Sequence, residues 1–213
     1  MVVVIGLGRF GMSLSGELQA LGHEVLGIDY DERLVQAASG ELTFVVQADA
    51  TDAAALKQLG VADVQHAVVA IGDAVQASIL TTATLSDLGI GDIWAKAQTS
   101  QHASILERVG ATHVVFPERD MGVRVAHRVT GRMLEYIQID EGFALVETTV
   151  PARFSGRTLI ESGIRQEFGV NVVGVKPEGA PFHHAAPNSR LGPNDLLLVA
   201  GEVRDVERFA AES

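Results

Sequence analysis

Residues 2–11 read Val-Val-Val-Ile-Gly-Leu-Gly-Arg-Phe-Gly, and this stretch decides the fold. Its β-branched start predicts a short buried strand, and Gly6, Gly8 and Gly11 form the pattern GxGxxG directly after it. In this pattern the first glycine permits a tight turn, the second lets a phosphate approach the backbone, and the third lets the next helix pack on the strand. A strand followed directly by GxGxxG is typical of a nucleotide-binding unit, but a glycine turn between closely packed elements would also explain why the sequence matches this pattern.

Acidic and small residues at the ends of later strands favour the nucleotide interpretation. Asp29 ends the second expected strand, about 20 residues beyond the glycines, where a carboxylate accepts hydrogen bonds from ribose hydroxyls. It would also serve as a cap for the following helix. Asp49 and Ala50 follow the third strand, where they would either face an adenine edge or cap the next helix, and Gly72 follows the fourth strand. The small residues of segment 74–88 are expected to pack rather than bind a ligand.

Three charged residues are candidates for a phosphate-binding role. Arg9 lies inside the glycine loop, where its guanidinium would offer two parallel hydrogen bonds to phosphate oxygens, although it would also be at home as an exposed cation. Lys96 ends the fifth expected strand, at the same edge of the sheet. Glu118 follows the sixth strand, where it would either cap a helix or ligate a hard cation that bridges phosphates.

Short β-branched runs alternate with helix-length segments through the first half of the chain. The expected strands are Val2–Ile5, Glu24–Ile28, Thr43–Val46, His66–Ile71, Ile93–Lys96 and His113–Phe116. The expected helices are Phe10–Leu21, Asp31–Ala38, Asp52–Leu59, Ala74–Leu88 and Gln101–Val109. Parallel strands joined by such helices need right-handed crossovers. The expected fold is therefore α/β, with a Rossmann-like doubly wound parallel sheet over residues 1–118.

A second, smaller domain is expected after this sheet. Met121, Val125, Val129 and Met133 recur at four-residue spacing and predict a connecting helix over residues 119–136. The sequence pattern then changes to short strand-like runs and two helical segments, which predict a small α+β domain over residues 137–213. Its expected strands are Ala144–Val150, Val170–Val175 and Leu196–Ala200, and its expected helices are Thr158–Ile164 and Val203–Ala211.

The composition argues against several classes of protein. The chain has 213 residues, 47% of them hydrophobic, with a net charge of −11 and no cysteine. The negative charge argues against nucleic acid as a partner, and the lack of cysteine excludes a disulfide framework and thiolate chemistry. No apolar run is long enough to cross a membrane, so a cytoplasmic protein is expected. Exposed loop positions are expected for the pair His183-His184, and neither a zinc-site spacing nor a nucleophile elbow is present, so no enzyme is indicated.

Four segments together resemble the RCK family, the regulators of potassium conductance. They are residues 6–11 (GLGRFG), 70–82 (AIGDAVQASILTT), 93–98 (IWAKAQ) and 117–123 (PERDMGV). The resemblance covers essentially the whole chain and is to the cytosolic regulatory subunits of bacterial Ktr/Trk potassium uptake systems. It implies an N-terminal Rossmann-like domain (RCK_N), a crossover helix used in dimerisation and a small C-terminal domain (RCK_C), in a protein that is not an enzyme.

The resemblance also implies ligands and partners. ATP and ADP would bind the N-terminal domain and switch the activity of the uptake system, with NAD a less favoured ligand. Homodimers would assemble into an octameric ring on a membrane-embedded potassium-translocating subunit of the KtrB/TrkH type, peripheral to the inner face of the membrane. Asp49 departs from the asparagine that the family often has. The nucleotide positions carried over are Gly6, Gly8, Arg9, Phe10, Gly11, Asp29, Asp49, Ala50, Gly72, Lys96 and Glu118, with Mg²⁺, Ca²⁺ or Na⁺ at Glu118 beside the phosphates.

A second nucleotide site is implied in the C-terminal domain, because some members of the family bind cyclic di-AMP between two such domains. The residues that match this pocket are Leu159, Ile160, Ile164, Arg165, Asn171 and Pro187. The aliphatic side chains would pack on adenine rings, and the arginine would pair with phosphate. Alternatively, the three aliphatic residues are the core face of a short helix and the arginine is its solvated end.

Two other functions remain open on the sequence. An NAD-dependent oxidoreductase would use the same glycines and Asp29, but the chain beyond the connecting helix is short for a catalytic domain and offers no evident acid–base pair. The gating ring of a potassium channel or of a cation/proton antiporter would carry the same domains beneath a different pore.

Overall fold

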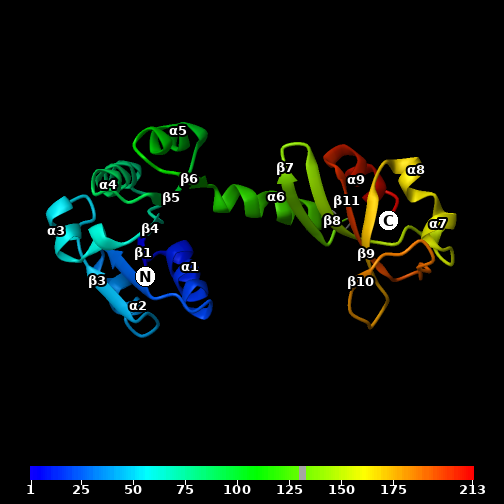
Figure 1. Ribbon diagram of the computed structural model, residues 1–213, viewed down its shortest axis with the longest axis horizontal. Coiled ribbons are helices and arrows are strands. Elements are labelled where there is room, and N and C mark those ends of the chain that lie inside the picture. Colours follow the sequence, from blue (N-terminus) through cyan, green and yellow to red (C-terminus); the bar gives the residue numbers. More distant parts are fainter. Residues whose placement is uncertain (130–132) are drawn as a thin grey trace. The chain divides into compact units, whose positions relative to one another are not determined.

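The computed structural model describes residues 1–129 and 133–213 of the chain (Figure 1). By its internal contacts the chain divides into Met1–Pro117, called here the first unit, and Glu118–Ser213, called the second unit. Each unit has a hydrophobic core of its own.

The first unit is built on a six-stranded sheet in the order β3-β2-β1-β4-β5-β6. All neighbouring strands are parallel, and the order reverses direction at β1 and β4. This arrangement confirms the expected Rossmann-like, doubly wound fold. The strands are β1 (Val2–Ile5), β2 (Val25–Asp29), β3 (Phe44–Gln47), β4 (His66–Val69), β5 (Asp92–Lys96) and β6 (His113–Val115).

Helices cover both faces of this sheet, which explains why its strands are apolar at consecutive positions. In β1, Val3 and Ile5 pack into the core that holds α3, α4 and α5, whereas Val2 and Val4 pack against α1 on the other side (Figure 1). The helices are α1 (Arg9–Ala20), α2 (Glu32–Ala38), α3 (Ala53–Gln58), α4 (Val75–Asp87) and α5 (Ser100–Arg108), with a short 3-10 turn, η1 (Val61–Asp63).

Helix α6 (Pro117–Val129) is shorter than the helix expected over residues 119–136. Residues 130–132 of that expected helix lie outside the described residues. The prediction of helix for residues 133–136 is wrong, because Met133 is buried in the core of the second unit and Glu135 begins strand β7 (Glu135–Asp140). Met133 continues the four-residue spacing of α6, but the amide of Leu134 already donates to the carbonyl of Glu147 and starts the pairing of β7 with β8.

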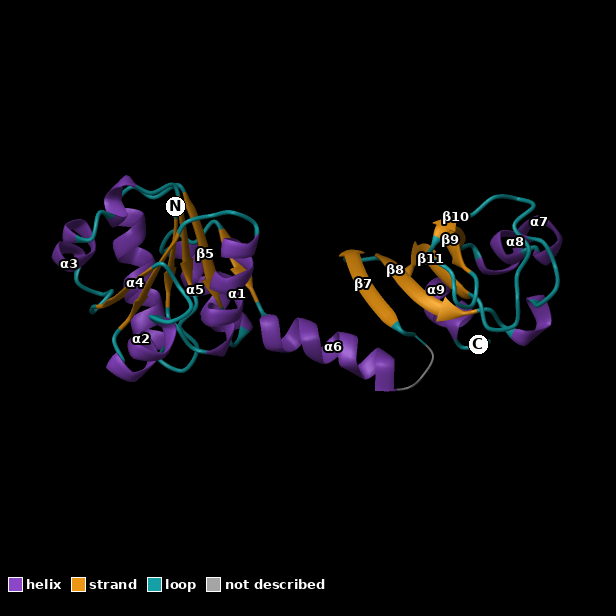
Figure 2. Ribbon diagram, turned by 90° about the horizontal axis from the view of Figure 1, so that it is seen from below, coloured by secondary structure: helices purple, strands orange, loops and turns teal. Residues whose placement is uncertain are grey.

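The second unit is α+β, as expected, with a five-stranded antiparallel sheet in the order β10-β9-β11-β8-β7 (Figure 2). The expected helix Thr158–Ile164 is broken at Gly163, which has a φ of 64°. His183 and His184, expected in a loop, form a short exposed strand instead. The remaining elements are β8 (Phe143–Thr149), η2 (Ala152–Phe154), α7 (Leu159–Ser162), α8 (Ile164–Phe168), β9 (Asn171–Lys176), β10 (His183–His184), β11 (Leu196–Glu202) and α9 (Val203–Ala210).

Candidate functional site

The glycine loop lies between β1 and α1, and each of its glycines meets a different surrounding. Gly6 has a φ of 100°, a conformation that side chains with a Cβ rarely adopt. A Cβ added to Gly11 would lie 1.8 Å from the carbonyl oxygen of Gly6, so this glycine lets α1 pack against the loop. A Cβ at Gly8, the N-cap of α1, would meet nothing within 4 Å. The backbone of Gly8 therefore borders open space beside the first-turn amides of α1, where helices bind anions.

Asp29 ties this loop to the end of β2. One of its carboxylate oxygens accepts a hydrogen bond from the amide of Leu7 at 2.6 Å, and the other accepts from the amide of Asp31 at 2.9 Å. The cap of α2 is Asp31, whose carboxylate accepts from the amide of Arg33 at 2.9 Å. Each carboxylate oxygen can accept more than one hydrogen bond, so Asp29 can hold the loop and still bind a hydroxyl.

In the loop after β3, one acidic residue caps the next helix and another is left to shape the turn at the cavity. Asp52 caps α3 by accepting from the amide of Ala54 at 2.8 Å. Asp49 instead accepts from the amide of Thr51 at 2.9 Å and from its hydroxyl at 2.7 Å. The hydroxyl hydrogen bond lowers the pKa of Asp49 below its ordinary value, so the carboxylate is ionised at neutral pH. Asp49 thereby fixes the turn that presents Ala50.

These loops enclose a cavity of about 650 Å³ at the carboxyl edge of the sheet, a volume typical of small-molecule sites. Ligands of doubly wound folds bind at this edge. Of the residues predicted for nucleotide binding, those that line the cavity are Gly6, Gly8, Asp29, Asp49, Ala50 and Gly72.

The other predicted residues lie outside the cavity lining. Lys96 is 9% exposed, its Nζ lies 5.7 Å from the centre of the Phe10 ring, and a Cβ on Gly72 would approach that Nζ to 3.4 Å. The Nζ of Lys96 therefore lies beside Gly72, over the ring of Phe10. The side chain of Arg9 is exposed at the first position of α1, and Glu118 lies in the first turn of α6, in the second unit.

Helix α4 contributes two lining residues that the sequence interpretation missed. Ala77 and Thr81 lie one turn apart on its surface and both line the cavity, although segment 74–88 was expected only to pack. Small residues at i and i+4 just after the Gly72 loop are the signal that would have found them. The loop residues Tyr30, Asp31 and Asp73 were also missed.

The cavity is acidic. Asp29, Asp31, Asp49 and Asp73 line it, and no lysine or arginine is among its described lining residues. The pKa of Asp31 is lowered by its hydrogen bonds with Arg33, and both side chains are exposed. A polyphosphate would therefore need positive charge from the amino end of α1, from the cations beside the loop, or from a bound metal ion.

A second cavity, of about 420 Å³, lies in the second unit among α7, α8, β9 and the loop after β10. The sequence left open whether the aliphatic residues of this segment form the core face of a short helix. Ile164 does lie in the hydrophobic core and is 2% exposed, whereas Ile160 is 71% exposed and lines the cavity. The amide of Ile160 donates to the carbonyl of Pro187 at 2.9 Å and joins the two walls. All six residues predicted for the second nucleotide line this cavity: Leu159, Ile160, Ile164, Arg165, Asn171 and Pro187.

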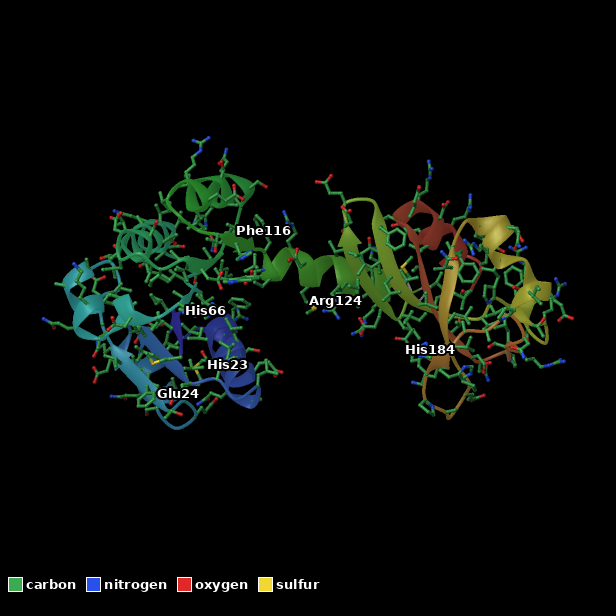
Figure 3. The ribbon with its side chains drawn as sticks, viewed as in Figure 1. His23, Glu24, His66, Phe116, Arg124 and His184 are labelled. Carbon is green, nitrogen blue, oxygen red and sulfur yellow. The ribbon has the colours of Figure 1, made fainter. Side chains whose placement is uncertain are left out.

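Histidines and acidic residues do not gather into a metal centre within the described part of the chain, where no group of three or more could hold an ion. His66 of β4 pairs with Asp92 of β5 at 2.7 Å, while His184 lies on β10 in the second unit (Figure 3). A cation at Glu118 would accordingly need ligands from nucleotide phosphates or from another chain. Among the described helices, none has the length and apolar character needed to cross a membrane.

Comparison with known proteins assigns both units to families. A TrkA-N domain matches residues 2–117, and a TrkA-C domain matches residues 143–212. The chain belongs to the TrkA family. It is 40% identical over 207 residues to Ktr system potassium uptake protein C of Bacillus subtilis (strain 168), which covers 97% of this chain and 94% of that protein. It is 37% identical over 210 residues to Ktr system potassium uptake protein A of the same organism, covering 98% and 95%.

Solved structures show the same fold. The GsuK RCK domain has a TM-score of 0.66 and 24% identity, and the match covers 99% of this TrkA-family chain and 46% of that chain. The GsuK channel bound to NAD has a TM-score of 0.66 and 23% identity, covering 98% and 38%. The chain thus spans less than half of either solved chain. The resemblance to RCK proteins expected from the sequence is confirmed by the domains, the relatives and the fold together.

Proposed function

We propose that this protein is the regulatory subunit of a bacterial potassium uptake system and that it binds an adenine nucleotide in the cavity of its first unit. The observation that carries the proposal is the convergence of the glycine loop, the amino end of α1 and Asp29 on one cavity of about 650 Å³. Full-length similarity to two Ktr potassium uptake proteins supports the role in transport.

The cavity suggests how the nucleotide would lie. The phosphates would meet the first-turn amides of α1 beside Gly8, with positive charge added by Lys96 next to Gly72 and by Arg9 of a neighbouring subunit. The ribose hydroxyls would donate to the remaining lone pairs of Asp29. The base would lie toward the loop after β3, where Ala50 offers an apolar surface.

Regulation would depend on the difference between ATP and ADP. A ligand shifts a conformational equilibrium only by its different affinities for the two states, so the terminal phosphate must make a contact that ADP lacks. Arg9, exposed at the start of α1, would make it from a neighbouring subunit of an octameric ring. The ring would act on a membrane-embedded potassium-translocating subunit of the KtrB/TrkH type, at the cytoplasmic face of the membrane.

Gly8 provides the test of the binding site. Its φ of −69° suits any residue and its Cβ position is free, so Gly8→Ala should fold normally while its methyl group occupies the place of the phosphates. Calorimetric titration should show ATP and ADP binding to the wild type and at least about tenfold weaker binding to Gly8→Ala, the size of one lost charge-assisted hydrogen bond. Gly16→Ala, also free of neighbours within 4 Å, is the control. Tight binding of NADH with no binding of either adenine nucleotide would favour the oxidoreductase alternative.

Arg9 provides the test of the switch. Arg9→Ala should bring the ATP and ADP affinities of the assembled protein to within about twofold of each other, because the cation that distinguishes their charges is gone. Arg108→Ala removes another exposed arginine of the first unit that does not line the cavity, and it should keep the wild-type preference. An unchanged preference in Arg9→Ala would contradict this role.

We propose that Glu118 of a neighbouring chain is a ligand of a cation that accompanies the nucleotide, across a dimer contact. The cavity already holds four carboxylates, so a polyphosphate brought to it gains from a hard ion such as Mg²⁺, Ca²⁺ or Na⁺. Titration of ADP with and without divalent ions should show a cation response in the wild type that is lost in Glu118→Gln. The same response in both proteins would contradict the role of Glu118.

The second cavity favours cyclic di-AMP as a further ligand, because it brings all six predicted residues together. A symmetric dinucleotide would lie on a two-fold axis between two copies of the second unit. We expect one molecule per two chains, with binding abolished by Arg165→Ala and kept by Arg204→Ala, an exposed arginine outside this cavity. Calorimetry with no saturable binding at about tens of micromolar ligand, in a confirmed dimer, would contradict this site.

A further inference from the structure

Thr81 of helix α4 is among the residues that line the cavity of the first unit, and it carries a buried, unpaired hydroxyl. The side chain is 0% exposed, and its Oγ1 has no hydrogen-bond partner among the described residues. Threonine hydroxyls in helices usually donate to the carbonyl four residues earlier, as Thr82 does to Ser78 at 2.8 Å and Thr84 to Leu80 at 2.9 Å in this helix. An unpaired buried hydroxyl destabilises a protein unless something in the site pairs with it.

The neighbours of Thr81 place it at the end of the cavity formed by the loop after β3. The hydroxyl of Thr84, three residues later, lies 3.4 Å from the carbonyl oxygen of Thr51, which joins α4 to that loop. Thr51 and Ala50 line the same cavity as Thr81. Ala77, one turn earlier on α4, also lines the cavity and adds only a methyl group to its wall.

We infer that Thr81 recognises the base of the bound nucleotide through a hydrogen bond between its hydroxyl and the edge of a purine ring. The inference rests on the proposed nucleotide binding in this cavity. A hydroxyl both donates and accepts, and the adenine edge offers ring nitrogens that accept and an amino group that donates. A pyrimidine carries a single ring and reaches less far from the ribose, so this contact would favour purine over pyrimidine nucleotides.

Thr81→Val tests the hydrogen bond, because valine has nearly the shape of threonine and carries a methyl group, which cannot form a hydrogen bond, in place of the hydroxyl. Calorimetric titration of the full chain with ADP and UDP should show about tenfold weaker ADP binding and UDP binding within about twofold of wild type, as expected for one net hydrogen bond. Thr81→Ser keeps a hydroxyl and should retain the preference for ADP. Ser78→Ala is the matched control, since Ser78 also has a buried unpaired hydroxyl on α4 but does not line the cavity.

The outcomes separate this inference from the proposed function. ADP binding by Thr81→Val within about twofold of wild type would overturn the role of Thr81 and leave nucleotide binding intact. Equal weakening of ADP and UDP would also overturn it, since the residue would then act through the helix and not through the base. Failure of the wild type to bind any purine nucleotide would overturn the proposed function, and the inference with it. The melting temperature of each variant without nucleotide reports whether it is folded, and Thr81→Ala replaces Thr81→Val if valine prevents folding.

Discussion

Asp29 shows how one side chain can serve both the fold and the ligand. Its carboxylate accepts from the amides of Leu7 and Asp31, so it orders the glycine loop before any nucleotide arrives. A role in ribose binding alone would predict that a substitution here changes affinity and leaves stability unchanged. The two backbone hydrogen bonds predict that both change.

We expect Asp29→Ala to weaken ATP and ADP binding by a similar factor of at least about ten and to lower the free energy of unfolding by about 1–3 kcal/mol, because two backbone amides lose their acceptor. Urea denaturation and calorimetric titration measure the two effects. Asp73→Ala is the control, because it removes another carboxylate from the cavity. The carboxylate of Asp73 accepts a long hydrogen bond of 3.5 Å from the side chain of Gln98, so this variant should leave the free energy of unfolding nearly unchanged. An Asp29→Ala protein of wild-type stability would show that the loop does not depend on this carboxylate.

His102 is a buried histidine whose titration should lower the stability of the first unit in acid. It is 3% exposed, its Nδ1 accepts from the amide of Gln98 at 3.4 Å, and burial lowers its pKa. In the unfolded chain this histidine has its ordinary pKa, near 6.5. Below that pH the unfolded chain therefore binds more protons at His102 than the folded chain does. The stability contributed by neutral His102 is complete above about pH 6.5 and is lost progressively as the pH falls toward its folded pKa.

Urea unfolding followed by the fluorescence of Trp94, the single tryptophan of the chain, should show little change from about pH 7.5 to 6.5 and a loss of stability as the pH falls from about 6.5 to 5.5. His102→Gln cannot titrate and should give a flatter dependence on pH over that range. His23→Gln, at an exposed histidine, should keep the wild-type dependence. Equal slopes for wild type and His102→Gln would mean that other groups carry the acid sensitivity.

At the scale of the element, helix α1 depends on one of its two internal glycines and not on the other. A Cβ on Gly11 would lie 1.8 Å from the carbonyl oxygen of Gly6, whereas a Cβ on Gly16 would meet nothing within 4 Å. We expect Gly11→Ala to push α1 away from the loop, lowering stability by about 3 kcal/mol or more and abolishing nucleotide binding. Gly16→Ala should stabilise the helix by about 0.5–1 kcal/mol. Thermal unfolding of both variants measures the contrast, and a stable, nucleotide-binding Gly11→Ala would contradict the packing argument.

The sequence predicts the elements of the first unit closely because each is short and has its own signal. The runs that begin at Val2 and His66 are strands of a parallel sheet, as predicted, since buried parallel strands are continuously apolar. The expected helix over 119–136 fails at Met133, where a matching apolar spacing cannot show that strand pairing takes over. Thr81 was missed for a related reason, because helical periodicity does not tell which face of α4 meets a cavity. The roles proposed for Arg9 and Glu118 would depend on contacts with other chains, which no local sequence pattern encodes.

At the scale of the whole molecule, the chain is a pair of small units with a separate candidate ligand site in each. The first carries the cavity at the carboxyl edge of a parallel sheet, and the second carries the cavity beside α7 and α8. Each unit has its own core, so each ligand can stabilise the unit that binds it. In an oligomer, any preference of a ligand for one arrangement of the chains is multiplied by the number of bound copies. Two ligands acting on one ring would then be coupled through the ring.

The proposed two-site arrangement predicts which unit responds to which nucleotide. A ligand present at about 100 times its dissociation constant stabilises the folded state that binds it by about 2.7 kcal/mol. Because Trp94 lies in β5, its fluorescence reports the unfolding of the first unit. We expect ADP to raise the midpoint of this transition and cyclic di-AMP to leave it nearly unchanged. Cyclic di-AMP should instead raise the midpoint of the part of the far-ultraviolet circular dichroism change that the Trp94 transition does not account for. Arg165→Ala should cancel only the response to cyclic di-AMP, and Gly8→Ala only the response to ADP. If cyclic di-AMP raised the midpoint of the Trp94 transition, or if ADP raised it equally in Gly8→Ala and Arg165→Ala, the assignment of one nucleotide to each unit would be wrong.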